Sequence, residues 1–515
     1  MTERAKPQPD SKRQRASYSQ IPEQAPAAAP GRPRAGLALA VAFLSGWAIM
    51  QIEILGGRLL APYFGYSIYQ WGALIGVVMA ALAAGYALGG RVGDRPGARR
   101  FLLVALAVSA AYIALIPPIG DALLPLFRGF GPAWGAVIAS AALLGVPSVL
   151  LATTSPIVIR LTASERIAGS AGRVYALSTV GSIAGTFFTA FLVIPEIGTR
   201  LGHYLGAALV AIALAALLAE KREWRGVAGT AVAFALLYPW PPALPAHVIL
   251  RTESVHNLIE VHDHPNVRAL YLNYTTGVQT IEVKGQLLTG EYFDLFLLGP
   301  YLNGGRKVLM LGAAGGVAMK QIAAVFPDAE VTGVDLDPAV LDVARAYFGL
   351  KDHPRIRLVA DDARWFLAQS RERYDVIAVD LYVTGTIPFF TATQEFFALA
   401  RSRLTEDGVL IMNMLSRRRG EEHIAPFVRT LQAAFPSVYA ASFGNYLLIA
   451  TNRPTDLAAL KARLDAEVSD PNLAHVLTRV RPTFRAAAAP PAFAPFRDDR
   501  NDVEFRSFRL LHGAD

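Results

Sequence analysis

The sequence predicts a two-part protein, in which a multi-pass α-helical membrane domain precedes a small β unit and a doubly wound α/β sheet. Three observations predict this fold class. The chain of 515 residues is 53% hydrophobic and only 17% charged, whereas a soluble protein carries about 25% charged residues. The hydrophobic excess lies between Ala35 and roughly Pro241. Beyond it, short apolar runs alternate with helical patterns, which is typical of a sheet with helices on both faces.

The first element is a predicted disordered basic tail over residues 1–35, which are rich in Pro, Ala, Gln, Lys and Arg and lack hydrophobic periodicity. The second is a membrane domain over residues 36–245. Small residues recur in it at four-residue spacing, as in Gly181 and Gly185, which lets helices approach closely in lipid. About seven apolar segments, several near the roughly 20 residues that cross a bilayer, lie near 36–56, 68–90, 100–119, 133–153, 174–195, 201–219 and 226–241.

Lys and Arg predict the orientation of these segments. The tail carries seven of them, "GGRVGDRPGARR" four and "EKREWRG" three, while alternate connections carry few. The positive-inside rule therefore places the N-terminus in the cytosol and the chain in the cell (inner) membrane. Seven spans would leave the C-terminal half outside. The last segment is short and ends in "YPWPPALP", so an interfacial or re-entrant helix is the alternative, and it would give the cytosolic C-terminal domain that we expect. Span parity leaves the side open.

Two charged residues, Glu53 and Arg58, lie in or at the end of the first segment. Charges at this depth usually face a partner or a water-filled cavity. A substrate path is one interpretation, and a structural ion pair near the interface is the other. We favour the ion pair, because the long arginine side chain can reach the interface.

The C-terminal half predicts a small β-hairpin unit over residues 246–290 and a larger α/β domain over residues 291–515. The runs that read as strands are "KVLMLG", "AEVTGVDLD", "IRLVADD", "YDVIAVDL" and "GVLIMNML", with helical patterns such as "PAVLDVARAYFGL" between them.

In such a sheet, ligands bind at the carboxyl ends of the strands, and four strand ends here carry informative residues. A glycine-containing turn follows the first strand, and Asp335 ends the second, where a carboxylate commonly binds ribose hydroxyls. The combination predicts a nucleoside site rather than an ordinary sheet with solvated acids. The residues concerned are Gly312, Gly315, Gly316, Asp335, Asp361, Asp362 and Asp380.

Composition also excludes several classes of site. The chain has no cysteine, so it has neither disulfides nor thiolate chemistry. Its nine histidines show no HExxH or comparable ligand spacing, and no metal site is predicted. Much of the net charge of +8 lies in the N-terminal tail and in short loops between the apolar segments. This distribution fits membrane topology, so no nucleic-acid partner is expected.

The sequence resembles the spermidine synthase (polyamine aminopropyltransferase) family, in the branch fused to a multi-pass membrane domain. The order and spacing of many pieces carry this resemblance, namely "SGWAIMQIEILGGRLLAPYFGYSIYQWGALIGVVMAALAAGYALGG", "YLNYTTGVQT", "GEYFDLFLLGP", "VLMLGAAGGVAMKQI", "VTGVDLDPAVLDVARAYF", "RLVADDARWFL", "YDVIAVDLY", "TATQEFFALARSRLTEDGVLIMN" and "FRDDRNDVEF". It implies a Rossmann-like, class I methyltransferase-like fold. It also implies that decarboxylated S-adenosylmethionine donates an aminopropyl group to a diamine such as putrescine.

The resemblance also assigns roles. Asp335 would hold the ribose hydroxyls, and Gln279 would line the site near the nucleoside. Asp362, with Ala363 beside it, would contact the adenine, and Asp361 would belong to the same cofactor-binding site. Tyr292 would position the attacking amine. Asp380 would be the general base or amine anchor.

Two positions depart from the family pattern. The family's glycine turn carries an Asp that binds the aminopropyl ammonium, where this sequence has Gly315, and a second Asp falls where this sequence has Val383. Glu291, Asp294 and Asp361 are other anionic candidates for the amine.

Three functions therefore stay open. The first is an integral-membrane aminopropyltransferase, and the second is an S-adenosylmethionine-dependent methyltransferase, which the missing Asp favours because that ligand carries a carboxylate. The third is a non-catalytic polyamine transporter or sensor. The expected partners are a polyamine or other amine, the lipid bilayer and a second copy in a homo-oligomer. The nucleoside would be a co-substrate, with no prosthetic group.

Overall fold

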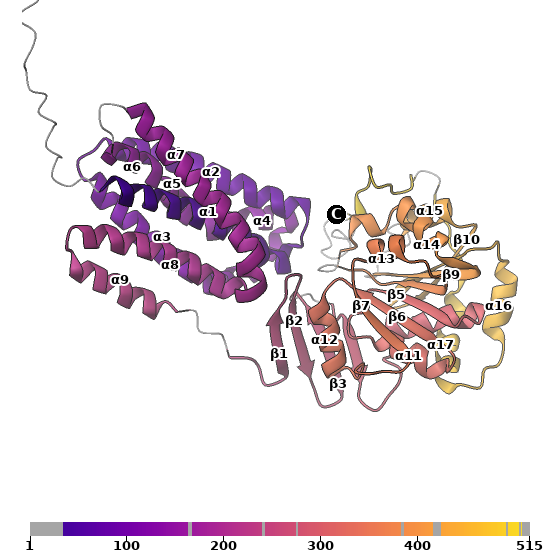
Figure 1. Ribbon diagram of the computed structural model, residues 1–515. Coiled ribbons are helices and arrows are strands. Elements are labelled where there is room, and N and C mark those ends of the chain that lie inside the picture. The colour runs from indigo at the N-terminus through magenta and orange to yellow at the C-terminus, as the bar shows by residue number, and fades with distance from the viewer. Residues whose placement is uncertain are drawn as a thin grey trace, which may run out of the picture.

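The computed structural model describes residues 34–162, 167–238, 243–273, 277–382, 386–415, 424–490, 493–503 and 506. A helical domain lies on one side of the molecule and a large sheet with flanking helices on the other, with a small antiparallel sheet between them (Figure 1). The predicted tail, except for its last two residues, and Val383 lie outside the described residues.

The helical domain contains six helices that are long and apolar enough to cross a membrane, counted over the residues described above. The third, fourth and fifth of these continue through 3-10 or π-helical turns, so the six extend over Ala35–Phe64, Ile68–Gly93, Ala98–Phe130, Ala133–Thr162, Ala168–Ile197 and Thr199–Glu220. The helix bounds are α1 Ala35–Phe64, α2 Ile68–Gly93, α3 Ala98–Phe127, α4 Pro132–Ser140, α5 Val146–Ala152, α6 Thr154–Thr162, α7 Ile167–Phe188, α8 Thr199–Glu220 and α9 Trp224–Leu236.

Glycines set the close packing of these helices. A Cβ at Gly181 of α7 would lie 2.1 Å from the carbonyl oxygen of Phe43 in α1. A Cβ at Gly85 of α2 would lie 2.4 Å from the carbonyl oxygen of Val149 in α5. Any larger residue at either position would force the backbones apart. The four-residue spacing of small residues therefore marks the positions at which helices pack closely.

The seventh predicted segment forms α9, which has 13 residues and is shorter than the other six. It runs back along α8, since Tyr204 of α8 stacks on Phe234 of α9 with ring centroids 4.1 Å apart. At about 1.5 Å per residue α9 covers about 20 Å of the roughly 30 Å hydrocarbon layer. The chain thus returns toward the end of the bundle at which α8 begins.

The two ends of the bundle differ in charge. The tail end, where α1 begins, is identified by the backbone N–H of Arg34, which donates to Glu220 at the end of α8 (2.6 Å). The opposite end, called the sheet end, holds Phe64 and Thr199. Among the Lys and Arg residues of the helical domain that the structure describes, three lie toward the sheet end, namely Arg58, Arg128 and Arg200. Ten lie toward the tail end, namely Arg34, Arg91, Arg95, Arg99, Arg100, Arg160, Arg173, Lys221, Arg222 and Arg225.

The predicted ion pair between Glu53 and Arg58 is wrong. Arg58 instead donates from Nη1 to the hydroxyl of Tyr66 (2.6 Å) and to the carbonyl of Val255 (2.8 Å), and from Nη2 to the carbonyl of Ser254 (2.6 Å). Five residues of α-helix rotate a side chain by about 140°, so Glu53 and Arg58 face different directions. Arg58 therefore fastens the helical domain to the loop that follows β1.

The small sheet contains β1 Val248–Glu253, β2 Leu258–Asp263, β3 Val267–Leu272 and β4 Thr280–Val283, all antiparallel and in that order. Its buried face, with Ile259, Val261 and Leu270, packs against α11 and α12 of the larger domain. The small sheet therefore joins the helical domain to the large sheet.

The large sheet has eight strands in the order β12-β10-β11-β9-β8-β5-β6-β7, of which β5 to β9 are parallel. This confirms the doubly wound α/β domain. The strand bounds are β5 Lys307–Leu311, β6 Glu330–Asp335, β7 Ile356–Ala360, β8 Tyr374–Val379, β9 Leu404–Met414, β10 Ser437–Phe443, β11 Asn445–Thr451 and β12 Arg485–Ala486.

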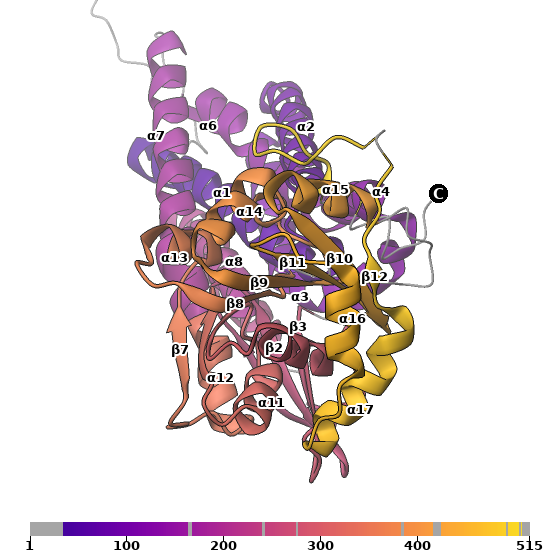
Figure 2. The same cartoon turned by 90° about the vertical axis from the view of Figure 1, so that its right-hand side faces the viewer.

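Helices cover both faces of this sheet. Residues Val308 and Met310 of β5 pack on one face with α10, α11, α12, α16 and α17, while Leu309 and Leu311 pack on the other with α13, α14 and α15. Figure 2 shows α16 and α17 together on the side away from the helical domain. The helix bounds are α10 Leu298–Asn303, α11 Val317–Val325, α12 Pro338–Tyr347, α13 Ala363–Gln369, α14 Gln394–Ser402, α15 Ala425–Ala434, α16 Leu457–Asp465 and α17 Pro471–Val480.

Candidate active site

A cavity of about 1550 Å³, which includes space open to solvent, lies at the carboxyl ends of the parallel strands. The chain order changes direction between β5 and β8, and a ligand in an open α/β sheet binds at such a point. The cavity contains residues of all three parts of the molecule. They are Arg58, Tyr66, Ser67, Val255, His256, Asn257, Leu272, Gln279, Gly312, Ala314, Val334, Asp335, Leu336, Asp361, Asp362, Ala363, Asp380, Leu381, Tyr382, Thr386, Pro388, Phe390 and Thr391.

The turn after β5 requires glycine at its first position. Gly312 has a φ of +91°, and a Cβ there would lie 2.1 Å from the carbonyl oxygen of Asp380. The turn therefore lies directly against the end of β8. A ligand in the cavity meets both strand ends at once.

Asp335 lies at the end of β6 beside this turn. Its Oδ2 accepts from the N–H of Ala314 (2.9 Å), and its Oδ1 accepts from the N–H of Asp337 (3.1 Å). Burial raises the pKa of Asp335 to about 6, although these backbone donors oppose the shift. A carboxylate held in this way can accept hydrogen bonds from two neighbouring hydroxyls, as the predicted ribose role requires.

Asp361, Asp362 and Ala363 follow β7 and line the cavity together. Asp362 also caps α13, because its Oδ1 accepts from the N–H of Trp365 (2.8 Å). The exposed side chain of Leu336 and the ring of Phe390 add apolar surface. This end of the cavity combines apolar side chains with a carboxylate, which suits a nucleobase.

Asp380 directly follows β8 and forms a polar cluster with two side chains. Its Oδ2 accepts from the Tyr292 hydroxyl (3.2 Å), and its Oδ1 accepts from Asn413 Nδ2 (2.8 Å). Asn445 Nδ2 donates to Asn413 Oδ1 (2.9 Å), which orients the amide of Asn413 toward Asp380. Burial raises the pKa of Asp380 to about 6, and the two donors oppose it. The carboxylate is therefore a base that titrates near neutral pH.

Two tyrosines around Asp380 stay protonated. Burial and the neighbouring carboxylate raise the pKa of Tyr292 and of Tyr382 well above the ordinary value. The Tyr382 hydroxyl donates to the carbonyl of Asn413 (3.0 Å). Tyr292 is thus a hydrogen-bond donor to Asp380, and Tyr382 fixes the strand that carries Asn413.

Gly315 and Gly316 shape the turn and do not line the cavity. The N–H of Gly315 donates to Thr280 Oγ1 (2.8 Å), and a Cβ at Gly315 would lie 2.7 Å from Thr280 Cγ2. Thr280 therefore occupies the space into which an aspartate at this position would extend. Gly316 has a φ of +75° and precedes the first turn of α11.

Of the other anionic candidates, Asp294 is unavailable to a ligand. It is buried, and its oxygens accept from the N–H and hydroxyl of Thr289 (2.9 and 2.8 Å), the N–H of Gly290 (2.8 Å) and Gln321 Nε2 (2.6 Å). It holds a loop together. Glu291 is exposed and lies outside the cavity lining, which leaves Asp361 as the candidate inside it.

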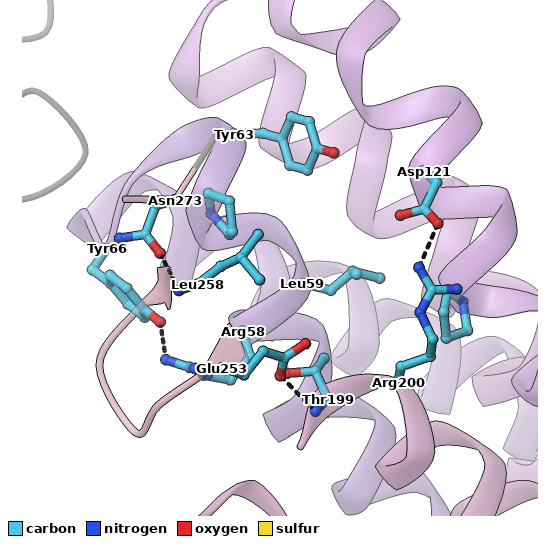
Figure 3. Close-up of a pocket in the computed structure, with 12 residues that line it drawn as sticks. Arg58, Leu59, Tyr63, Tyr66, Asp121, Thr199, Arg200, Glu253, Leu258 and Asn273 are labelled. Atoms are coloured by element: carbon cyan, nitrogen blue, oxygen red, sulfur yellow. Dashed lines mark hydrogen bonds and ion pairs between the residues drawn. The ribbon is translucent and has the colours of Figure 1, made fainter. Parts of the chain in front are cut away.

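The helical domain supplies one wall of the cavity through Arg58, Tyr66 and Ser67. Arg58 and Tyr66 also line a second pocket of about 550 Å³ at the junction of the domains (Figure 3). There Glu253 Oε2 accepts from the N–H of Thr199 (2.8 Å), and Arg200 pairs with Asp121 (2.5 Å). The sequence marked Arg58 as unusual but did not place it at the site.

The sequence also missed Asn413, Tyr382 and Thr280. Each lies within one of the stretches that carry the resemblance. Asn413 and Tyr382 also lie near the ends of predicted strands, and this position was a signal that could have identified them. From the "FRDDRNDVEF" stretch, Asp498 pairs with Arg364 of α13 (2.5 Å) and supports the helix that begins at Ala363.

Comparison with known proteins agrees with this geometry. Residues 299–444 match the family described as the spermine/spermidine synthase domain. A probable polyamine aminopropyl transferase of Bifidobacterium longum is 34% identical over 197 residues, which cover 38% of this chain and 42% of that protein. Polyamine aminopropyltransferase 2 of Ralstonia nicotianae is 28% identical over 386 residues, which cover 68% of this chain and 72% of that protein.

Among solved structures, a probable spermidine synthase from Corynebacterium glutamicum is 18% identical, with a TM-score of 0.37 over 50% of this chain and 100% of that one. The match to the Bifidobacterium protein spans less than half the length of that relative.

Proposed function

The C-terminal part of this chain contains a spermine/spermidine synthase domain, and from this premise we propose that the protein is an integral-membrane aminopropyltransferase. Its donor is decarboxylated S-adenosylmethionine, and its acceptor is a diamine such as putrescine. The nucleoside is a co-substrate, and no prosthetic group takes part.

The observation that carries this proposal is the presence of both halves of the reaction site in one cavity. Asp335 and Asp362 lie at the end that suits a nucleoside, and Asp380 lies beside the turn at Gly312. Holding donor and acceptor side by side makes the reaction effectively unimolecular, which is worth several kcal/mol of the barrier, up to about 7–11.

In the reaction, the neutral amine nitrogen attacks the aminopropyl carbon that is bonded to sulfur. A C–N bond forms, the C–S bond breaks with its electron pair going to sulfur, and methylthioadenosine leaves. Asp380 takes the proton that the new ammonium loses. Tyr292 and Asn413 orient this carboxylate (3.2 and 2.8 Å). General-base catalysis of this kind contributes a factor of about 10²–10⁴.

A second function, methyl transfer from S-adenosylmethionine, is favoured by one observation. Thr280 fills the space beside Gly315, so no carboxylate meets the donor's tail from this turn. An acid at this position would repel the carboxylate of S-adenosylmethionine, and Gly315 has no side chain to do so. The same base could then serve an acceptor that receives a methyl group.

Product analysis separates the two functions. The full chain in lipid nanodiscs would be given putrescine with either donor, and the nucleoside product would be identified by mass spectrometry. Methylthioadenosine from the decarboxylated donor, together with spermidine, supports aminopropyl transfer. The opposite result is S-adenosylhomocysteine from intact S-adenosylmethionine and no methylthioadenosine from the decarboxylated donor. It would refute aminopropyl transfer and support methyl transfer.

We also propose that the long helices span a membrane and that the synthase domain lies on the side opposite the N-terminus. Arg58 binds the synthase domain at the sheet end of the bundle, which carries few Lys and Arg residues. The positive-inside rule assigns the tail end to the cytosol. We therefore propose a position on the far side for the synthase domain in place of the expected cytosolic one, with α9 forming part of a seventh crossing.

Single cysteines test this orientation directly, because the chain has none of its own. Lys351→Cys would place a thiol on an exposed site of the synthase domain, and Lys221→Cys would place one at the tail end. A membrane-impermeant maleimide added to spheroplasts should label the first and not the second until the cells are lysed. Labelling of Lys221→Cys alone would reverse the orientation.

A further inference from the structure

Three histidines of the small sheet converge on its surface. His247 precedes β1, His262 lies in β2, and His264 follows β2. One ring nitrogen from each lies within 4.8 Å of the others. The rings of His247 and His264 are stacked with centroids 4.9 Å apart, and those of His247 and His262 are 5.1 Å apart. None of the three lines the cavity described above.

Strand pairing produces this arrangement. His262 and His264 are two residues apart, so they extend from the same face of the strand. The N–H of Asp263 donates to the carbonyl of His247 (2.8 Å), which holds the start of β1 beside the end of β2. The spacing of 15 residues between His247 and His262 hides the cluster from a search of the sequence for ligand motifs.

A buried carboxylate fixes one of the rings. Nε2 of His262 lies 2.9 Å from Oε2 of Glu260, and the side chain of Glu260 also pairs with Arg251 (2.5 Å). Glu260 is only 7% exposed. In the neutral tautomer that donates from Nε2 to this carboxylate, Nδ1 carries the lone pair that a metal ion needs. A carboxylate behind a ligating imidazole is the usual outer partner of a metal site, where it fixes the ring's orientation and raises its basicity.

We propose that His247, His262 and His264 bind a divalent transition metal of the zinc type, with water completing the coordination. Three neutral imidazoles suit zinc, nickel, copper or cobalt rather than magnesium or calcium. With a bond of about 2.0–2.1 Å to each nitrogen and tetrahedral angles, the ligand atoms of such a site lie about 3.4 Å apart. The three nitrogens lie within 4.8 Å of one another, so rotation of the histidine side chains about their χ angles has to bring them closer by on the order of an ångström.

The site has a structural role. The chain enters the synthase domain from the helical domain at His247, and β1 is the edge strand of the small sheet. A metal that joins His247 to the end of β2 therefore clips this edge strand to its neighbour. The other end of β1 leads to Ser254 and Val255, whose carbonyls bind Arg58.

The test uses the full chain, purified in detergent through a histidine-free affinity tag and stripped with EDTA. Titration with Co²⁺ should give a d–d absorption band that saturates at one ion per chain, and Zn²⁺ should displace it. His264→Ala and His262→Ala should each weaken binding by at least about 100-fold. Glu260→Gln should weaken it by about 10–100-fold, as expected for an outer partner. His475→Ala, on an exposed site of α17, is the matched control.

A second readout guards against misfolded variants. Zn²⁺ should raise the melting temperature of the wild-type chain and of His475→Ala, but not that of His264→Ala, whose melting temperature without metal should match the wild type. The proposal is overturned if the wild-type chain binds no Co²⁺ at micromolar concentrations, or if His264→Ala and His475→Ala bind it equally well.

Discussion

The amide of Asn413 should control the pH dependence of the proposed reaction. It donates to Asp380 Oδ1 at 2.8 Å and is itself oriented by Asn445. Asn413→Leu keeps a side chain of similar size and removes the donor. A hydrogen bond to a charged group contributes about 1.5–3 kcal/mol, and 1.36 kcal/mol corresponds to one pKa unit. The pKa of Asp380, which burial has raised to about 6, should therefore rise by about 1–2 units.

The sign follows from the role of Asp380 as a base. Only its ionised form accepts the proton, and the free amine, whose pKa is about 10, must be neutral. The logarithm of kcat/KM should thus rise with a slope of two below the pKa of Asp380 and a slope of one above it, up to about pH 10. In the wild-type chain the slope should change at about pH 6. In Asn413→Leu it should change at about pH 7–8.

The assay is the rate of methylthioadenosine release across pH 5 to about 10 at low acceptor concentration. Asn445→Ala, which removes the bond that orients the Asn413 amide, should shift the break in the same direction by less. A variant whose rate falls equally at every pH, with the break unmoved, would show that Asn413 acts on folding alone and would refute this reasoning.

Further predictions concern other parts of the site. Asp380→Asn should lower kcat by about 10²–10⁴. Its melting temperature should nevertheless exceed that of the wild type at pH 8, but not at pH 4. The reason is that burial raises the pKa of Asp380 to about 6, so that ionising this carboxylate at higher pH destabilises the fold. Gly315→Asp should destabilise the chain by about 1–3 kcal/mol through its clash with Thr280, and adding Thr280→Gly should restore stability in urea unfolding while increasing the preference for the decarboxylated donor. Asp335→Ala should weaken methylthioadenosine binding by about 10–100-fold in calorimetry, at about 1.4 kcal/mol per tenfold. Arg58→Ala should raise KM for the acceptor. An unchanged KM would show that the helical domain does not take part in acceptor binding through this residue.

The parts of the fold that follow from local pattern could be predicted from the sequence. Asp335 and Asp380 end strands of a parallel sheet, and parallel strands bring their carboxyl ends to one edge, so both were expected at one site. Gly181 indicated close helix packing for a local reason as well, since only a small residue allows it.

The parts that depend on contacts between distant segments could not be predicted. Asn413 reaches Asp380 only because β9 lies beside β8 and Asn445 of β11 orients its amide. The interpretation of Arg58 failed in the same way, because the two carbonyls that it binds lie almost 200 residues away in the loop after β1. Thr280 meets Gly315 only through the packing of the small sheet on the large one.

The attachment of the synthase domain to the lysine- and arginine-poor end of the bundle bears on how the reaction is supplied. The proposed donor is a sulfonium cation, and a charged solute does not pass unaided through hydrocarbon. A synthase on the far side of the membrane therefore depends on a donor delivered to that compartment, and its nucleoside product is released there. Vesicles that expose the synthase domain to the external donor should then turn over much faster than vesicles of the opposite orientation. The membrane would in that case control access of the donor to the enzyme as well as anchor it.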